Sequence, residues 1–341
     1  MSLFTFSFRE PLAVLTAVGV LAFGLVVTTA PAQADAATTV SATGGVSTEV
    51  EASASVWSAS GAVTASIDVE ATATASTPTV APPEELSPPG ANDWTCVPTS
   101  AHPDPVILVP GTFESMAKNW STLSPYLKNQ GYCVYALNYG TTNGIDATGP
   151  IADSARELSA FVDRVLAASG ADQADIVGHS QGGMMPRYYL GFLGGADKVD
   201  ALVGIAPSNH GTEGLITPTP EQVPISSGDA DVVCQACADQ EAGSPFLTEL
   251  NSIGDLVDGP SYTVISTKFD EVVTPYQSQF LAGPAARVTN ITIQDLCPAD
   301  PIEHDQAPND PVVHQLVGNA LEQKTGRPAD AAFSPSCVPL G

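Results

Sequence analysis

Residues 175–184 read DIVGHSQGGM, and Gly178, Ser180 and Gly182 at their centre form the pentapeptide G-x-S-x-G. This spacing is typical of a nucleophile elbow, where a strand ends, the chain turns sharply and a helix begins. The turn holds the serine in a strained backbone conformation, and small residues two before and two after it let strand and helix approach. The pentapeptide therefore predicts that Ser180 is a nucleophile. The alternative is a glycine-rich turn whose serine has no chemical role.

The residues on either side of the pentapeptide support the elbow. Residues 174–177 form a short apolar run suited to a buried parallel strand. Apolar residues then recur at helical spacing from 184 to 193 and stop at the glycine pair 194–195. A strand before the serine and a helix after it are what the elbow requires.

The first 34 residues are expected to be a secretory signal peptide. Arg9 precedes an apolar run over residues 12–27, and small residues lead to an A-x-A cleavage site at residues 32–34. An uncleaved membrane anchor is the alternative, because the run nearly reaches spanning length. The cleavage pattern favours removal, so we expect the mature protein to be secreted, with no stable membrane insertion.

Residues 35–90 differ in composition from the rest of the chain. They are built mainly from Ala, Thr, Ser, Val and Gly, with Trp57 as the one aromatic residue, and they end in a proline-rich stretch over 78–89. This composition predicts a low-complexity spacer or propeptide, although its β-branched residues would also permit a small strand-rich module. Residues 91–341 are then a single catalytic domain, long enough to bury a sizeable core.

The chain is strongly acidic, because 11 Lys and Arg stand against 37 Asp and Glu, for a formal net charge of −26. No basic cluster interrupts this pattern, so nucleic acid and anionic membrane surfaces are poor candidates for partners, and we expect no nucleic acid partner. We interpret the acidic composition as a feature that keeps the protein soluble outside the cell. Adaptation to high salt is the alternative.

The six cysteines all follow the predicted cleavage site, and an even number in an exported chain predicts three disulfides. Their spacing alone does not choose among the pairings. Cys234 and Cys237 form a C-x-x-C pair, but no second such pair completes a zinc site and the flanks are not thioredoxin-like, so a local disulfide is favoured. We expect no metal. The candidates are Cys96, Cys133, Cys234, Cys237, Cys297 and Cys337.

A serine hydroxyl is a weak nucleophile near neutral pH, so it needs a base, an acid that orients the base, and donors for the oxyanion. In α/β-hydrolases the three catalytic residues follow the chain order Ser, Asp or Glu, His. The strand-like run over residues 262–266 leads into a turn that carries Asp270. Asp270 is therefore the candidate acid, and the neighbouring Glu271 is the alternative.

Two histidines follow the next strand-like run, over residues 288–293. His304 lies in a loop-like segment between prolines, whereas His314 lies where apolar residues recur at helical spacing. A histidine in the second setting belongs on a helix face, so His304 is the candidate base. The remaining histidines precede the acid: His102, His179 and His210.

The oxyanion needs two sources of N–H groups. One is Gln181, the residue after the nucleophile, and the other is a turn after an early strand. Residues 106–109 form an apolar strand-like run that ends in a Pro-Gly turn, and Thr112 follows. Thr112 could offer its backbone N–H and its hydroxyl. The alternative is a simple turn with Thr112 at the surface.

In this order the segments resemble those of the secreted bacterial lipases of the α/β-hydrolase superfamily, and they are similar also to the yeast lipase B type. The resemblance covers roughly residues 94–340. It rests on the strand and oxyanion turn at 106–112, the elbow at 176–183, the acid loop at 270–275 and the histidine loop at 297–304.

The resemblance implies an α/β-hydrolase fold, with a mostly parallel central sheet and helices on both faces. It implies Ser180, Asp270 and His304 as the triad, with Thr112 and Gln181 as oxyanion donors. It also suggests disulfides between Cys96 and Cys133 and between Cys297 and Cys337, which leaves Cys234 to pair with Cys237.

The chain departs from the yeast enzymes in two places. They carry threonine where this chain has Gly178, which places the elbow closer to the bacterial form. Residues 211–244, where a lid or a wall of the acyl pocket would lie, have no clear match. The acyl-chain preference therefore stays open.

The sequence thus predicts a secreted serine ester hydrolase, a lipase that cleaves acylglycerols through an acyl-enzyme and needs no cofactor. Its partner would be a water-insoluble ester or a lipid–water interface, and we expect a monomer. A polyester depolymerase and a short-chain carboxylesterase are alternatives with the same chemistry. A non-catalytic surface protein with a hydrolase fold is the alternative from another class.

Overall fold

A computed structural model describes residues 87–214, 234–323 and 326–337, together with the backbone of five short strands nearer the N-terminus. The chain divides into two compact units, Met1–Ala81 and Pro82–Gly341. The predicted cleavage site lies outside the described residues. No helix in the described part of the chain combines the length and the apolar composition that a membrane span needs.

The described strands of the first unit are antiparallel. One sheet has the order β1-β4-β5, and β2 pairs with β3 in another. The strands are β1 (Ala13–Thr16), β2 (Val26–Val27), β3 (Val40–Ser41), β4 (Ser53–Ser58) and β5 (Gly61–Ser66).

The second unit is built on an all-parallel sheet with the strand order β11-β10-β9-β8-β6-β7. Almost every residue of these strands is buried, which explains their nearly continuous apolar character. The mostly parallel central sheet predicted from the sequence is confirmed. Its strands are β6 (Val106–Val109), β7 (Val134–Ala136), β8 (Ala174–His179), β9 (Val199–Ile205), β10 (Ser261–Ser266) and β11 (Val288–Thr292).

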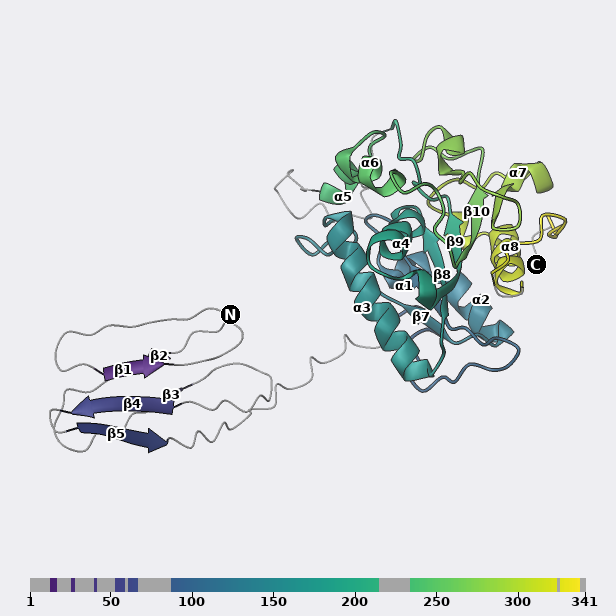
Figure 1. The fold of residues 1–341 in the computed structure, drawn as a ribbon. Coiled ribbons are helices and arrows are strands. Elements are labelled where there is room, and N and C mark those ends of the chain that lie inside the picture. The colour runs from purple at the N-terminus through teal and green to yellow at the C-terminus, as the bar shows by residue number, and fades with distance from the viewer. Residues whose placement is uncertain are drawn as a thin grey trace. The chain divides into compact units, whose positions relative to one another are not determined.

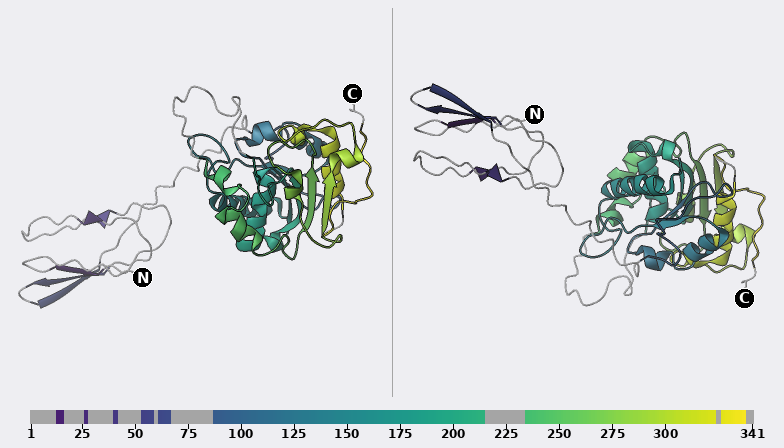
Figure 2. Two further views of the ribbon diagram at one scale, coloured as in Figure 1. Left: turned by 90° about the horizontal axis from the view of Figure 1, so that it is seen from above. Right: turned by 90° about the horizontal axis from the view of Figure 1, so that it is seen from below.

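Helices pack on both faces of this sheet (Figures 1 and 2). Successive strand residues point to opposite faces, so Ile107 and Val109 enter one core cluster, whereas Val106 and Leu108 enter the other. The first cluster is completed by α3 (Ile151–Ser169), α4 (Gln181–Phe192), α5 (Gln235–Asp239) and α6 (Pro245–Asn251). The second is completed by α1 (Met116–Asn119), α2 (Leu123–Gln130), α7 (Ile293–Leu296) and α8 (Pro311–Leu321).

The ends of the long helices follow from local chemistry. α8 begins with Pro311, where a missing N–H costs nothing, and the carboxylate of Asp310 accepts hydrogen bonds from the backbone N–H groups of Val312 (2.7 Å) and Val313 (3.0 Å). α3 ends at Ser169, and the next residue, Gly170, has a φ of 72° in the left-handed region. These residues therefore determine where α8 begins and where α3 ends.

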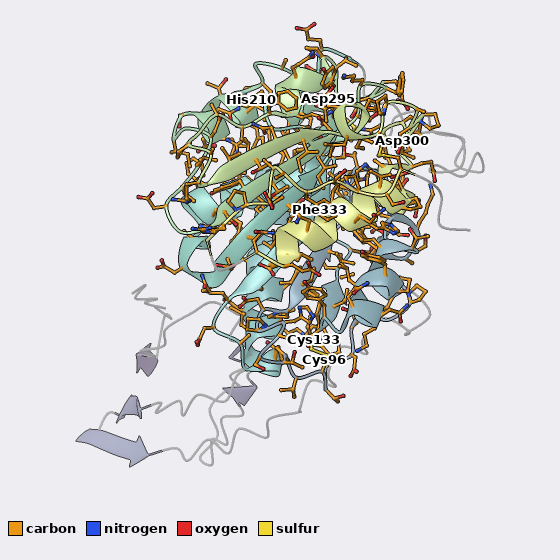
Figure 3. The ribbon with its side chains drawn as sticks, turned by 90° about the vertical axis from the view of Figure 1, so that its right-hand side faces the viewer. Cys96, Cys133, His210, Asp295, Asp300 and Phe333 are labelled. Atoms are coloured by element: carbon orange, nitrogen blue, oxygen red, sulfur yellow. A yellow bond between two sulfur atoms is a disulfide. The ribbon has the colours of Figure 1, made fainter. Side chains whose placement is uncertain are left out.

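Three disulfides occur in the second unit. Their Cα–Cα distances are 5.7 Å for Cys96–Cys133, 5.3 Å for Cys234–Cys237 and 5.4 Å for Cys297–Cys337. Figure 3 shows the first of them. These are the three pairs that the resemblance implied, and the expectation is confirmed.

Candidate active site

Ser180 lies at the sharp turn between β8 and α4. Its φ of 53° and ψ of −123° are unusual for a residue with a side chain. The surrounding structure holds this conformation, because the Ser180 N–H donates to the carbonyl of Ile205 on β9 (2.9 Å) and its own carbonyl accepts from the N–H of Gly183 (3.0 Å). The strand–turn–helix predicted from the pentapeptide is confirmed.

The two glycines of the pentapeptide are required by close contacts across the elbow. A Cβ atom at Gly178 would lie 1.9 Å from the carbonyl oxygen of Gly182, and one at Gly182 would lie 2.2 Å from the carbonyl oxygen of Val109 on β6. Real Cβ atoms do not approach a backbone oxygen so closely. Steric room, rather than an unusual φ, therefore explains why both positions are glycine.

Asp270 and His304 meet although 34 residues separate them: Nδ1 of His304 lies 2.8 Å from Oδ2 of Asp270, and both side chains are buried. The carboxylate has three more donors. Oδ1 accepts from the N–H groups of Val272 (2.9 Å) and Val273 (2.7 Å), and Oδ2 accepts from Nε2 of Gln279 (2.8 Å). Four hydrogen bonds therefore fix its orientation toward the imidazole.

The pKa of His304 is raised above its ordinary value of 6.5, although burial, the largest single influence, lowers it. The negative charge of Asp270 and its hydrogen bond raise this pKa. The nearby charges of Asp305 and Glu271 raise it as well, and the four influences together outweigh burial. Because a carboxylate only accepts, Nδ1 of His304 carries the proton. The Nε2 atom is thereby left as the basic nitrogen.

The alternatives for acid and base take no part in this pair. Glu271 has an exposed side chain. His314 lies on α8, where its Nε2 is 2.9 Å from the carbonyl oxygen of Pro308 and its ring centroid is 5.2 Å from that of Tyr126. His314 is thus a packed residue of a helix face, as its apolar spacing predicted.

His179 connects three parts of the site: the turn at Gly111, Asn119 and the segment that carries His304. The sequence did not reveal this role, because the second position of G-x-S-x-G admits many residues. Oδ1 of Asn119 accepts from the N–H of Gly111 (2.8 Å), so the Asn119 amide group is left to donate to Nδ1 of His179 (3.2 Å). His179 therefore carries its proton on Nε2 and donates it to the backbone carbonyl of His304 (3.1 Å). Burial lowers the pKa of His179 well below 6.5 and keeps the ring neutral.

Thr112 is buried in the turn after β6, which rules out the alternative with Thr112 at the surface. Its hydroxyl oxygen lies 2.8 Å from Nε2 of Gln181 and 2.9 Å from Nε2 of Gln240. The turn lies against the elbow, since a Cβ atom at Gly111 would be 3.2 Å from Cβ of Ser180. Gln240 was missed because residues 211–244 carried no pattern that pointed to the site.

The structure thus brings the predicted oxyanion residues to the elbow and pairs the predicted acid with the predicted base. Over the described ranges, no group of three or more His, Cys, Asp and Glu side chains is arranged to hold a metal ion.

A parallel sheet whose central strand leads into this elbow defines a member of the α/β-hydrolase superfamily. More narrowly, the chain belongs to the lipase (class 2) family, whose model matches residues 103–317.

Comparison with individual proteins supports this family assignment. Two triacylglycerol lipases, from Pseudarthrobacter phenanthrenivorans and Burkholderia plantarii, are each 37% identical to this chain over 89 residues, or 25% of it. The match spans about a quarter of the length of these curated relatives, 27% and 24% respectively. The solved structure of Aspergillus fumigatus lipase B shares the fold, with a TM-score of 0.56 and 22% identity over 72% of this chain and 57% of that one.

Proposed function

We propose that this protein is a secreted serine ester hydrolase that cleaves acylglycerols, with Ser180, His304 and Asp270 as its catalytic triad. The observation that carries the proposal is the buried hydrogen bond between His304 and Asp270, which leaves Nε2 of His304 basic. Membership of the lipase (class 2) family and relatives named triacylglycerol lipase support the choice of substrate class.

The reaction proceeds by acyl transfer. Ser180 attacks the ester carbonyl while Nε2 of His304 accepts the hydroxyl proton, and Asp270 stabilises the imidazolium that forms. The N–H groups of Gln181 and Thr112 donate to the oxyanion of the tetrahedral intermediate. His304 then protonates the leaving alcohol, and water repeats the sequence on the acyl-enzyme. The chemistry requires no metal or organic cofactor.

Export is part of the proposal. It is supported by the predicted signal peptide and by three disulfides, which persist in oxidising compartments. A soluble acidic protein of this kind would meet its substrate at a lipid–water interface, and we propose that it does so as a monomer.

Hydrolysis of an acyl-chain series tests the substrate class. The mature protein is assayed on triglycerides of graded chain length beside a polyester film, with Ser180→Ala as the control. We expect turnover of triglycerides and its loss in Ser180→Ala. Cleavage of short soluble esters alone would identify a carboxylesterase, and preferential erosion of the film would identify a polyester depolymerase.

Labelling with a fluorophosphonate tests the chemistry independently of the substrate. We expect the folded, oxidised protein to label at Ser180. Absence of label, together with absence of turnover on every ester, would favour a non-catalytic surface protein with a hydrolase fold.

A further inference from the structure

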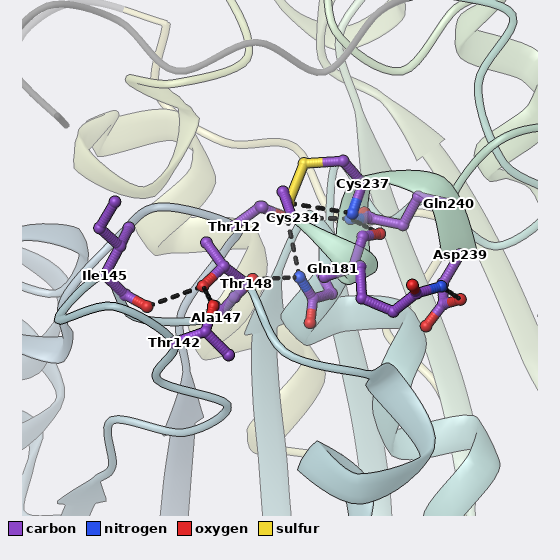
Figure 4. Close-up of a disulfide and its surroundings, with 12 residues drawn as sticks. Thr112, Thr142, Ile145, Ala147, Thr148, Gln181, Cys234, Cys237, Asp239 and Gln240 are labelled. Atoms are coloured by element: carbon purple, nitrogen blue, oxygen red, sulfur yellow. Dashed lines mark hydrogen bonds between the residues drawn. A yellow bond between two sulfur atoms is a disulfide. The ribbon is translucent and has the colours of Figure 1, made fainter. Parts of the chain in front are cut away.

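Gln240 reaches the site from a part of the chain that the sequence did not connect with it. It follows α5, its side chain is completely buried, and it contacts Thr112 although 128 residues separate the two (Figure 4). The contact joins the Gln240 carboxamide to the Thr112 hydroxyl, so its direction depends on how the amide is oriented.

The partners of Gln240 fix that orientation. One end of the amide lies 3.0 Å from the carbonyl oxygen of Ala236, which can only accept, so this end is the donor Nε2. The other end accepts from the hydroxyl of Ser208 at 2.8 Å. Nε2 has two hydrogens, and the second is directed at Oγ1 of Thr112. Both hydrogens of Nε2 and the oxygen Oε1 of Gln240 thus have hydrogen-bond partners.

Gln181 approaches the same hydroxyl in the same way. Its Nε2 donates to the carbonyl oxygen of Ala147 (2.9 Å) and to Oγ1 of Thr112 (2.8 Å). A hydroxyl has two acceptor positions and one hydrogen. Because two amide donors occupy both acceptor positions, the Thr112 hydroxyl can act toward any third group only as a donor.

We infer that Gln240 is a positioning residue that forces the Thr112 hydroxyl to donate to the oxyanion formed at Ser180. The turn that carries Thr112 lies against Ser180, through the approach of Gly111 to the serine Cβ. The inference rests on the proposed function and deepens it, because it assigns a role to a residue outside the proposed triad and the proposed oxyanion donors.

The N–H of Gln240 donates to the carbonyl of Cys237 (3.2 Å), which belongs to the Cys234–Cys237 disulfide. This disulfide closes the first turn of α5, where Sγ of Cys234 also lies 3.1 Å from the N–H of Cys237. The N–H of Ala236 donates to the carbonyl of Thr148 (3.1 Å), and the carbonyl of Gln240 accepts from the N–H of Thr212 (3.0 Å). These contacts hold the segment that carries Gln240 against the loops at Thr148 and Thr212.

Steady-state kinetics of Gln240→Met on a soluble ester test the inference. Methionine has a similar size but no donor, so we expect kcat to fall about tenfold, less than the loss of a whole oxyanion donor, with KM unchanged. The matched control is Gln235→Met, the same change at an exposed position of α5, the helix that Gln240 follows, and it should leave kcat unchanged.

A double-mutant cycle separates positioning from general damage. Thr112→Val removes the hydroxyl and keeps the shape, so adding Gln240→Met to it should lower kcat no further. Additive losses in the double variant would overturn the inference, as would a kcat of Gln240→Met equal to that of the unmodified protein.

Gln240→Glu provides a second variant if Gln240→Met fails to fold, which thermal melting would reveal. A carboxylate accepts the Thr112 hydrogen and withdraws it from the oxyanion, so kcat should fall about a hundredfold. A kcat within about twofold of the unmodified protein would contradict the inference. Ser180→Ala distinguishes the two proposals. If this variant retains turnover, the proposed function is wrong. If it loses turnover while Gln240→Glu stays fully active, only the role of Gln240 is refuted.

Discussion

Replacing Asp270 by asparagine probes the carboxylate with the least change in shape. Oδ1 faces the backbone N–H groups of Val272 and Val273, and Oδ2 faces Nδ1 of His304 and Nε2 of Gln279. All four partners are donors. Whichever way the new amide is turned, its NH₂ group must therefore face two of them.

The two orientations differ in free energy. With the NH₂ group toward the backbone, two buried N–H groups lose their acceptor, at a cost of about 1–3 kcal/mol each. With the NH₂ group toward His304, both partners can adapt. The imidazole can move its proton from Nδ1 to Nε2, and Gln279 can turn its amide, whose buried Oε1 has no partner within the described ranges. The second orientation is therefore favoured.

This orientation removes the base without unfolding the protein. With its proton on Nε2, His304 cannot accept a proton from Ser180, so we expect kcat of Asp270→Asn to fall about 10⁴-fold. The lost charge-assisted hydrogen bond should lower the free energy of unfolding by about 1.5–3 kcal/mol. The expected signature is a folded protein with the wrong histidine tautomer.

Kinetics on a soluble ester, urea unfolding and nitrogen NMR of the imidazole measure the three quantities. Glu271→Gln is the matched control, and it should keep kcat within about twofold, because this exposed carboxylate does not contact His304. The reasoning fails if Asp270→Asn retains more than about a tenth of kcat. It also fails if the proton stays on Nδ1 of His304.

Three further outcomes are expected. His304→Ala should abolish turnover in an ester assay, whereas His314→Ala should keep most of it and lose about 1–3 kcal/mol of stability; the reverse result would show that the base is His314. The pKa of His304 is raised in the folded protein and its neutral form is the base, so kcat/KM should fall as pH drops, with a midpoint above about 6.5 in a pH–rate profile. A midpoint below that value would contradict the effect of the carboxylate. Gly178→Ala should destabilise the protein in thermal melts by about 3 kcal/mol or more, because its Cβ would lie 1.9 Å from the Gly182 carbonyl oxygen. The control Gly318→Ala, in a roomy helical position, should instead stabilise it by about 0.5–1 kcal/mol.

The fold was predictable because its signals are local. Short apolar runs marked β6, β8 and β10, and the pentapeptide marked the turn between β8 and α4. The chain order of acid and histidine, together with the loop-like setting of each, singled out Asp270 and His304, which the structure pairs. The catalytic roles of these residues stay predictions.

The support of the site was not predictable in the same way. Gln240, Gln279 and His179 contribute through side-chain amides or a ring that reach across distant parts of the chain. The two glutamines are of a common residue type and their neighbours in the sequence carry no motif, whereas His179 lies at a position of G-x-S-x-G that admits many residues. Which hydrogen bonds they form depends on how the loops pack over the carboxyl ends of the strands, and periodicity does not encode this.

The position of His179 has a consequence for altering substrate scope. Its ring donates to the backbone of the segment that carries His304 and accepts from Asn119, which in turn holds the oxyanion turn. A library randomised at His179, the residue before the proposed nucleophile, is one way to seek new selectivity. In this protein such a library would trade selectivity against catalytic competence, unless Asn119 is randomised with His179 so that the pair can be replaced together.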